Sequence, residues 1–331
     1  MNTRLAILGT GSWGTALAMS LAPRFDDVGL WCREAGRAAE IEESRENARY
    51  LPGFRLPPNI RVSCDLNGTL EGADIVVIAI PSAHLRDVLG AAAEFLSTET
   101  RVVSATKGIE EGTLLRMSQV IGDVLRGSVS IGSLSGPTFA KEIAAGEPAA
   151  VAIASSDIAF AEEIQRRFSS ASLRLYASTD LIGVEVGAAL KNVIAIGAGI
   201  CRGLGLGSNS VAALVTRGLA EITRLALRMG GQPRTLAGLA GLGDLVLTAT
   251  GDLSRNRFVG AQLGQGRRLE QVLSGMTMVA EGVGTCRAAH ELGLRHEIDL
   301  PIISRMYEVL YENKEPRQAI RELMERPLTS E

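Results

Sequence analysis

Short apolar runs alternate with amphipathic segments over the first half of the chain. The runs are rich in valine, isoleucine and leucine, which is typical of strands buried on both faces of a sheet. They predict strands at Arg4–Leu8, Val28–Arg33, Ile60–Cys64, Asp74–Ile80, Arg101–Ala105, Val129–Leu134, Ala149–Ser155 and Leu173–Tyr176. Helical stretches lie between most of these runs, for example at Ala83–Leu96, Thr113–Arg126 and Asp157–Phe168. This alternation indicates a doubly wound, mainly parallel α/β sheet.

Beyond Asp180 the pattern changes to helical spacing. We expect helices at Leu181–Cys201, Val211–Met229, Asn256–Gly264, Val283–Leu292, Pro301–Tyr311 and Pro316–Met324. At about 150 residues per domain, a chain of 331 residues has room for two domains. The pattern therefore predicts an α/β domain over residues 1–180 and an all-helical domain over residues 181–331.

The turn after the first predicted strand carries a glycine pattern. Residues Gly9–Gly14 read GTGSWG, with the spacing G-x-G-x-x-G, and small and aliphatic residues that suit a helix follow them. In such a turn Gly9 permits the sharp bend, Gly11 lets a pyrophosphate approach the backbone, and Gly14 lets helix and strand touch. The helix N-terminus then presents free N–H groups to the phosphates. The pattern is weak alone, but its place between a strand and a helix favours dinucleotide binding.

Composition excludes several classes of function. The formal net charge is −3, so no overall field favours nucleic acid or an anionic membrane. The four cysteines lie far apart and the three histidines lack metal or triad spacing, so we expect buried, reduced thiols and no metal. The chain enters a strand at once, which leaves no room for a signal peptide, and its longest apolar run, Val186–Cys201, is too short and too polar for a transmembrane segment. We therefore expect a cytoplasmic protein.

Charged residues follow the second predicted strand. Arg33 stands about where an acidic residue holds the adenosine ribose in NAD enzymes. An arginine there suits a 2′-phosphate and favours NADP, whereas the adjacent Glu34 leaves NAD open. Arg37 follows one helical turn later, and a solvated charge explains it as well.

Two later strand ends also carry candidate residues. Lys107 follows a buried strand at the carboxyl edge of the sheet, where a bare surface lysine has little structural purpose. Gly136, Pro137 and Thr138 repeat the strand–turn–helix pattern: Pro137 suits a first helical turn, and the nearby N–H groups can bind an anion. A plain helix cap explains Pro137 and Thr138, but not their place beside the other strand ends.

Lys191 is the only charged side chain between Val186 and Cys201, and Asn192 lies beside it. An unpaired charge in a buried helix costs too much, so Lys191 points to a partner or a ligand. The alternative is a lysine that extends to solvent.

Three further clusters lie in the predicted helical domain. Asp244 follows a glycine-rich turn and is explained equally well as a helix N-cap or a site residue. Ser254–Arg257 combines a hydroxyl, guanidiniums and an amide at a helix start, which suits a phosphate, although a capped basic helix start is the simpler alternative. A surface turn explains Val279–Gly282.

In combination these segments resemble the bacterial NAD(P)-dependent glycerol-3-phosphate dehydrogenases over essentially the whole chain. The matching segments are Gly9–Gly14, Leu30–Arg33, Tyr50–Gly53, Ala105–Gly108, Ser135–Glu142, Leu190–Asn192, Leu239–Thr248, Ser254–Arg257 and Val279–Gly282. The resemblance implies a Rossmann-type N-terminal domain, an all-α C-terminal domain like that of 6-phosphogluconate dehydrogenase, and a homodimer. It also implies an NAD(P)+ oxidoreductase acting on CH–OH groups, which reversibly reduces dihydroxyacetone phosphate to sn-glycerol 3-phosphate for glycerophospholipid synthesis.

The resemblance carries over to single positions. It implies Lys191 as general acid/base, with Lys107 and Asp244 orienting or tuning it. The residues implied around NADP(H), or NAD(H), are Gly9, Gly11, Ser12, Trp13, Gly14, Arg33, Lys107, Ala140, Arg255, Val279 and Glu281. Those implied around the substrate are Lys107, Gly136, Thr138, Lys191, Asp244, Ser254, Arg255 and Asn256. Thr138 stands where relatives often have serine, and it retains the hydroxyl.

Two other readings remain open. A 6-phosphogluconate or 3-hydroxyacyl-CoA dehydrogenase would share the glycine turn and an interior lysine or histidine, although Gly136–Thr138 and Ser254–Arg257 favour a small phosphorylated substrate. A catalytically silent NADP(H)-sensing or scaffolding protein would have no need of Lys107, Lys191 and Asp244 together. The sequence leaves open the NADP or NAD preference, the direction in the cell, feedback control, the extent of domain closure and the oligomeric state.

Overall fold

The computed structural model describes residues 3–126, 129–276 and 278–328. Residues 1–2 and 329–331, the outer ends of the two predicted domains, lie outside these ranges, as do residues 127–128 and 277. The chain forms two compact units, one of Met1–Lys107 with Leu115–Glu185 and the other of Gly108–Leu114 with Val186–Glu331. No sequence pattern indicated that the short segment Gly108–Leu114 packs with the second unit.

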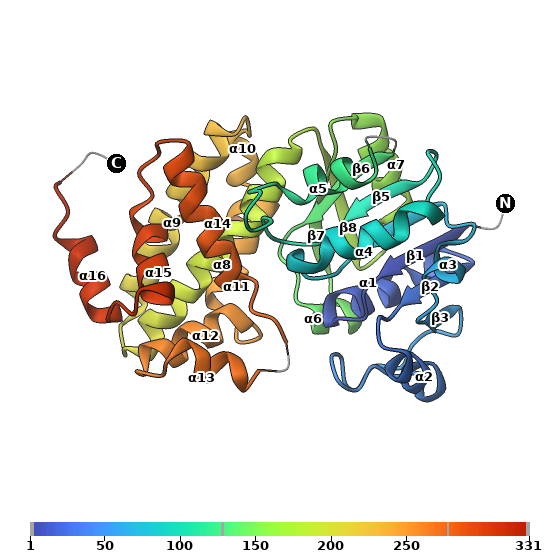
Figure 1. Ribbon diagram of the computed structural model, residues 1–331, viewed down its shortest axis with the longest axis horizontal. Coiled ribbons are helices and arrows are strands. Elements are labelled where there is room, and N and C mark those ends of the chain that lie inside the picture. The colour runs from blue at the N-terminus through green and yellow to red at the C-terminus, as the bar shows by residue number, and fades with distance from the viewer. Residues whose placement is uncertain (1–2, 127–128, 277, 329–331) are drawn as a thin grey trace. The chain divides into compact units, whose positions relative to one another are not determined.

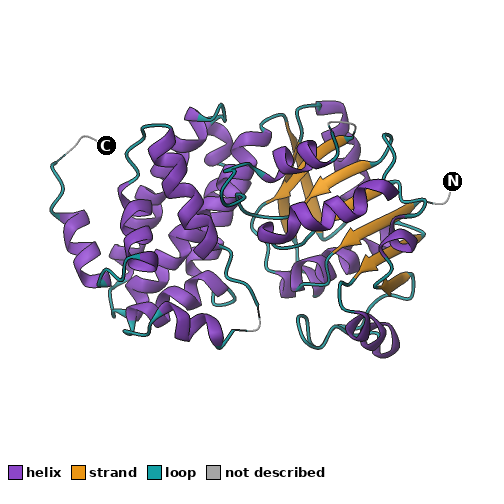
Figure 2. Ribbon diagram, viewed as in Figure 1, coloured by secondary structure: helices purple, strands orange, loops and turns teal. Residues whose placement is uncertain are grey.

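The first unit is built on one eight-stranded sheet in the order β3-β2-β1-β4-β5-β6-β7-β8. Figure 2 shows its strands in orange, with helices packed beside them. Its strands are β1 (Arg4–Leu8), β2 (Asp27–Trp31), β3 (Ile60–Ser63), β4 (Ile75–Ile78), β5 (Arg101–Ser104), β6 (Ser130–Ser135), β7 (Ala149–Ala154) and β8 (Leu173–Ser178). Only β6 and β7 pair antiparallel among the neighbours in this sheet. The predicted mainly parallel, doubly wound sheet is confirmed.

Helices cover both faces of the sheet, which is why central strands such as β1 and β4 are apolar, whereas the edge strands β3 and β8 also carry exposed residues. Alternate residues of β1 point to opposite faces: Leu5 and Ile7 join one core cluster, and Ala6 and Leu8 join the other. The first cluster includes residues of α1 (Ser12–Leu21), α2 (Ala35–Ser44), α6 (Ala140–Ala144) and α7 (Ile158–Phe168). The second includes residues of α3 (Leu66–Leu70), α4 (Leu85–Ala92) and α5 (Met117–Val124).

Two predictions of helix starts in the N-terminal half of the chain are wrong. The helix expected from Thr113 begins only at Met117, because Leu114 adopts a left-handed φ of 62° that an α-helix cannot contain. Pro137 does not lie in a first helical turn, since α6 begins at Ala140. The predicted buried thiols hold for Cys32, Cys201 and Cys286, whereas Cys64 is exposed.

The described part of the second unit contains helices but no strand (Figure 1). They are α9 (Ser208–Arg228), α10 (Pro233–Leu236), the π-helix η4 (Leu239–Gly243), α11 (Asp244–Thr250), α12 (Arg255–Gly264), α13 (Leu269–Ser274), α14 (Gly282–Arg295), α15 (Pro301–Tyr311) and α16 (Pro316–Met324). Helix α8 (Leu181–Gly203) begins in the first unit and forms the core of the second. The predicted all-helical C-terminal half is confirmed.

Helix α8 corrects one expectation from the sequence. The run Val186–Cys201 is too short and too polar to cross a membrane, but the whole helix, with 23 residues, is long and apolar enough to do so. Within its most apolar window, however, 89% of the residues are buried inside the protein. Its apolar character therefore serves the core, as in the central helix of a soluble protein.

Glycines let α8 and α12 pack backbone against backbone. A Cβ on Gly199 would overlap the carbonyl oxygen of Arg257, and one on Gly260 would overlap that of Ile196. Only residues without a side chain allow two helices to approach so closely. This contact holds the first turn of α12 beside the helix that carries Lys191.

Candidate active site

The glycine turn after β1 has the geometry that its pattern predicts. Gly9 has a φ of +119°, and a Cβ there would lie 2.6 Å from the carbonyl oxygen of Ala79. A Cβ on Gly14 would overlap the carbonyl oxygen of Gly9. By contrast, a Cβ on Gly11 would meet no atom within 4 Å. The turn is therefore tightly packed at Gly9 and Gly14 and open at Gly11, where a ligand can reach the backbone.

Polar groups around this turn fit a dinucleotide. The indole Nε1–H of Trp13 is buried without a hydrogen-bond partner in the described structure. Asn47 braces the turn from behind, since its Nδ2 donates to the carbonyl oxygen of Thr10 and to Oγ1 of Thr15, each at 2.8 Å. Sequence reasoning missed Asn47, because nothing in its surroundings along the chain links it to residues more than thirty positions away.

The residues after β2 separate into a paired and an unpaired arginine. Arg37 lies 3.1 Å from Glu34 and donates to the hydroxyl of Tyr50 at 3.0 Å. Arg33 is exposed, and no partner for it is found among the described residues. Arg33 is thus the more available of the two for a phosphate.

The carboxyl edge of the sheet brings Lys107, Gly136 and Thr138 together. Lys107 Nζ lies 3.4 Å from the carbonyl oxygen of Gly136, to which the Thr138 hydroxyl also donates at 3.1 Å. Gly136 is required here because its φ is +155° and a Cβ would lie 2.8 Å from Cα of Val151. The cluster places one cation and one hydroxyl beside a tight turn.

In the second unit, the predicted partner of Lys191 is Asp244. The lysine is 5% exposed and its Nζ makes a short hydrogen bond to Asp244 Oδ1, while Asp244 is completely buried. Nζ also donates to Oγ1 of Thr248 at 2.9 Å, and that hydroxyl donates to the carbonyl oxygen of Asp244 at 2.6 Å. Sequence reasoning missed Thr248, although its position one helical turn after Asp244 was a usable signal.

Asp244 is not a helix N-cap. It is the first residue of α11, and Gly243 occupies the cap position. The preceding turns form a π-helix, in which a Cβ on Gly241 would overlap the backbone of Leu236. The glycine-rich segment thus turns the chain tightly enough to bury the Asp244 carboxylate against Lys191.

The start of α12 supplies a second set of polar groups. Ser254 is the N-cap, and its hydroxyl accepts the backbone N–H of Arg257 at 3.2 Å. The side chain of Asn256 turns inward and accepts the N–H of Gly282 at 3.0 Å. Arg255 is half-buried, and the described residues provide it with no partner.

The remaining predicted residues differ in exposure. Ser12 and Ala140 are partly buried in the first unit; in the second, Val279 is 53% exposed and Glu281 is partly buried immediately before α14. Asn192 is buried beside Lys191, and a Cβ on Gly282 would lie 2.7 Å from its carbonyl oxygen. Within residues 3–126, 129–276 and 278–328, no three His, Cys, Asp or Glu residues gather in a group able to hold a metal.

A nucleotide-type glycine turn on a parallel sheet, followed by a helical half with a buried lysine–aspartate pair, defines a two-part α/β dehydrogenase. Family models agree: the N-terminal model of NAD-dependent glycerol-3-phosphate dehydrogenase matches residues 4–161 and the C-terminal model matches residues 180–321. The chain belongs to the glycerol-3-phosphate dehydrogenase family.

Individual relatives match over the full length. The glycerol-3-phosphate dehydrogenases [NAD(P)+] of Koribacter versatilis and Geobacter sulfurreducens are 51% and 50% identical to the chain, each alignment covering at least 99% of both sequences. The crystal structure of glycerol-3-phosphate dehydrogenase from Coxiella burnetii is 40% identical, has a TM-score of 0.94, and aligns over 98% of this chain and 99% of that one.

Proposed function

We propose that the chain catalyses the reversible, NAD(P)-dependent interconversion of dihydroxyacetone phosphate and sn-glycerol 3-phosphate. The observation that carries the proposal is the buried Lys191–Asp244–Thr248 cluster in a full-length member of this family. A charge buried this deeply needs a chemical reason, since an apolar side chain would serve the core at lower cost. Acid–base chemistry on a substrate oxygen is such a reason.

The first unit would hold the cofactor. The open backbone at Gly11 and the unpartnered Nε1–H of Trp13 fit a dinucleotide at the start of α1, where N–H groups of the first helical turn have no partner within the helix. Ser12, Arg33, Lys107 and Ala140, together with Arg255, Val279 and Glu281, complete the proposed set of contacts. Arg33 favours the 2′-phosphate of NADP(H), with NAD(H) as the second cofactor. When bound, the reduced nicotinamide supplies a hydride to C2 of the ketone.

Lys191 acts on the oxygen of that ketone. As negative charge grows on the oxygen during reduction, Nζ donates a proton to it, and in the reverse direction Nζ accepts the proton back. Asp244 and Thr248 fix the direction of the ammonium group through their hydrogen bonds. A donor that is already held in place does not have to reorient during the reaction. This preorganisation is the main source of electrostatic catalysis.

The other proposed residues bind the substrate. Arg255, half-buried and without a partner in the described chain, would hold the phosphate at the helix start capped by Ser254, with Asn256 beside it. Lys107, Gly136 and Thr138 would approach the substrate from the carboxyl edge of the sheet. An α/β cofactor domain over 1–180 and a helical catalytic domain over 181–331 are part of this proposal, as are a homodimer and a cytoplasmic location.

The test is the loss of reduced-nicotinamide absorbance when purified protein meets dihydroxyacetone phosphate. NADPH and NADH are tried separately, and unphosphorylated dihydroxyacetone is the control. We expect rapid oxidation with the phosphorylated ketone alone, and the ratio of the two cofactor rates measures the contribution of Arg33. Protein that binds NADPH but oxidises it with neither ketone would contradict the proposal and favour a cofactor sensor.

A further inference from the structure

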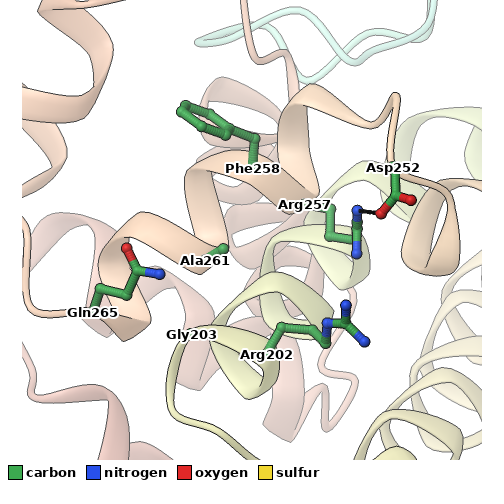
Figure 3. Close-up of a pocket in the computed structure, with 7 residues that line it drawn as sticks. All are labelled: Arg202, Gly203, Asp252, Arg257, Phe258, Ala261 and Gln265. Carbon is green, nitrogen blue, oxygen red and sulfur yellow. Dashed lines mark hydrogen bonds and ion pairs between the residues drawn. The ribbon is translucent and has the colours of Figure 1, made fainter.

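A hollow of about 280 Å³ lies between the end of α8 and the first turns of α12. Gly203 and Ala261 form part of its wall, where the two helices pack backbone against backbone. Arg202 and Arg257 also line it, and their guanidinium groups lie one above the other at the same end (Figure 3). Phe258 points away from this end, so the two arginines dominate its chemistry.

The charge in this hollow is only partly balanced. Arg257 pairs through Nη2 with Asp252, a carboxylate whose side chain is 91% exposed and therefore a weak partner. The Nε–H of Arg257 has no acceptor within the described residues, and no partner for Arg202 is found there either. Two guanidiniums facing one hollow with one solvated carboxylate leave a net positive charge, which favours an anion between them.

Arg202 is not needed to complete its own helix. The last carbonyl oxygens of α8 already accept backbone N–H groups: Ile200 from Leu204, Cys201 from Leu206 and Arg202 from Gly205. A C-terminal cation gains something from the helix dipole, but that gain does not require a position over a hollow opposite a second arginine.

We propose that this hollow is a second anion site, which binds a phosphate group through Arg202 and Arg257. Two planar guanidinium forks need several acceptor oxygens, and a phosphate dianion supplies them. The site is separate from the one proposed above. Arg202 follows Lys191 by three helical turns, or about 16 Å along α8. Arg257 follows Arg255 by two positions, which places their side chains on nearly opposite sides of α12.

The experiment is a calorimetric titration with inorganic phosphate at constant ionic strength. It is carried out in the Arg255→Gln variant, so that the proposed substrate cradle does not contribute. Arg202→Gln is then added and compared with Arg228→Gln. Arg228 is a matched control, because it also lies in the last turn of a long helix whose final carbonyls are satisfied by backbone N–H groups.

We expect Arg202→Gln to weaken phosphate binding roughly tenfold or more, the usual cost of losing a charge-assisted hydrogen bond, and Arg228→Gln to leave it unchanged. Asp252→Asn should tighten binding about two- to fivefold, because it frees Arg257. Glycerol 2-phosphate in a parallel titration separates the sources: tighter binding than inorganic phosphate indicates an organic phosphate ester, and equal binding indicates free phosphate.

Equal effects of Arg202→Gln and Arg228→Gln would overturn the proposal, as would the absence of phosphate binding once Arg255 is replaced. The titration needs no turnover, so its outcome is independent of the dehydrogenase assay.

Discussion

At the scale of single residues, Lys191 ties catalysis to stability. Lys191→Met removes the proposed proton donor, and we expect turnover to fall roughly 10²–10⁴-fold. It also leaves the fully buried Asp244 carboxylate without its cation, which should cost about 3–5 kcal/mol of unfolding free energy. Initial rates and urea unfolding of the same preparation measure both effects.

A double variant separates the two roles. Lys191→Met combined with Asp244→Asn contains no buried charge at this position, so most of the lost stability should return while turnover stays low. Near-normal turnover in either variant would show that Lys191 is not the acid.

The glycine turn offers a second contrast between neighbouring residues. Gly11 has an ordinary φ of −67° and open space where a Cβ would lie, so Gly11→Val should change the unfolding free energy by no more than about 0.5 kcal/mol while weakening NADPH binding. Gly14→Ala forces a Cβ onto the carbonyl of Gly9 and should cost about 1–3 kcal/mol or more. Fluorescence titration with NADPH and chemical unfolding test the pair; unchanged affinity in Gly11→Val would remove the pyrophosphate from this turn.

At the scale of elements, the contact between α8 and α12 depends on glycine. Gly260→Ala places a Cβ onto the carbonyl oxygen of Ile196 and should destabilise the protein by about 1–3 kcal/mol or more. Gly90→Ala is the control: Gly90 lies within α4 with nothing near its missing Cβ, so alanine there should stabilise by about 0.5–1 kcal/mol. Thermal unfolding of both variants checks the difference in sign.

Glu221 joins α9 to α15 and makes the stability depend on pH. Its buried carboxylate accepts the N–H groups of Ile302 and Ile303, at 2.7 and 3.1 Å, at the start of α15. Burial outweighs these hydrogen bonds and the nearby Arg224, and with some help from Asp299 it raises the pKa of Glu221 from 4.5 to about 7.

The sign follows from proton uptake. Between pH 4.5 and about 7 the folded state binds more protons at Glu221 than the unfolded state does, so this contribution to stability declines as the pH rises. Across this pH range, the contribution of Glu221 to the unfolding free energy falls by about 3 kcal/mol in total. Unfolding free energies measured across this range should fall less steeply with rising pH for Glu221→Gln than for the parent protein; parallel curves would show that Glu221 does not titrate there.

At the scale of the whole molecule, we expect the chain to form a homodimer. Large exposed apolar side chains lie on the second unit, among them Leu227, Leu242, Val246, Leu253 and Phe258. We expect light scattering to give twice the chain mass of 35.0 kDa at micromolar concentration, with the dimer covering part of this surface. A mass of one chain at that concentration would contradict the dimer.

The sheet was predictable because its signal is local. Central strands such as β1 and β4 are buried on both faces and are apolar runs, whereas the edge strands β3 and β8 alternate buried and exposed residues. All eight described strands lie within two residues of the predicted runs. Short helices such as α3 and α10 carry too few residues for a periodic pattern, and they were missed. Helix α5 begins later than expected because Leu114 has a left-handed backbone conformation, and the pattern of side chains does not predict that conformation.

The amino-acid sequence by itself determined the fold class, the glycine turn and the need for a partner at Lys191, since these follow from periodicity, spacing and the cost of burying a charge. The family resemblance implied Asp244 and Lys107 as residues that orient or tune Lys191. The tertiary structure shows that Asp244, fifty-three positions away, hydrogen-bonds to Lys191 directly and that Thr248 joins the pair. It also decided that Arg257 lines a hollow together with Arg202, which Arg255 does not line. Such choices depend on which helices pack together and how closely, and that is set by contacts between segments far apart in the chain.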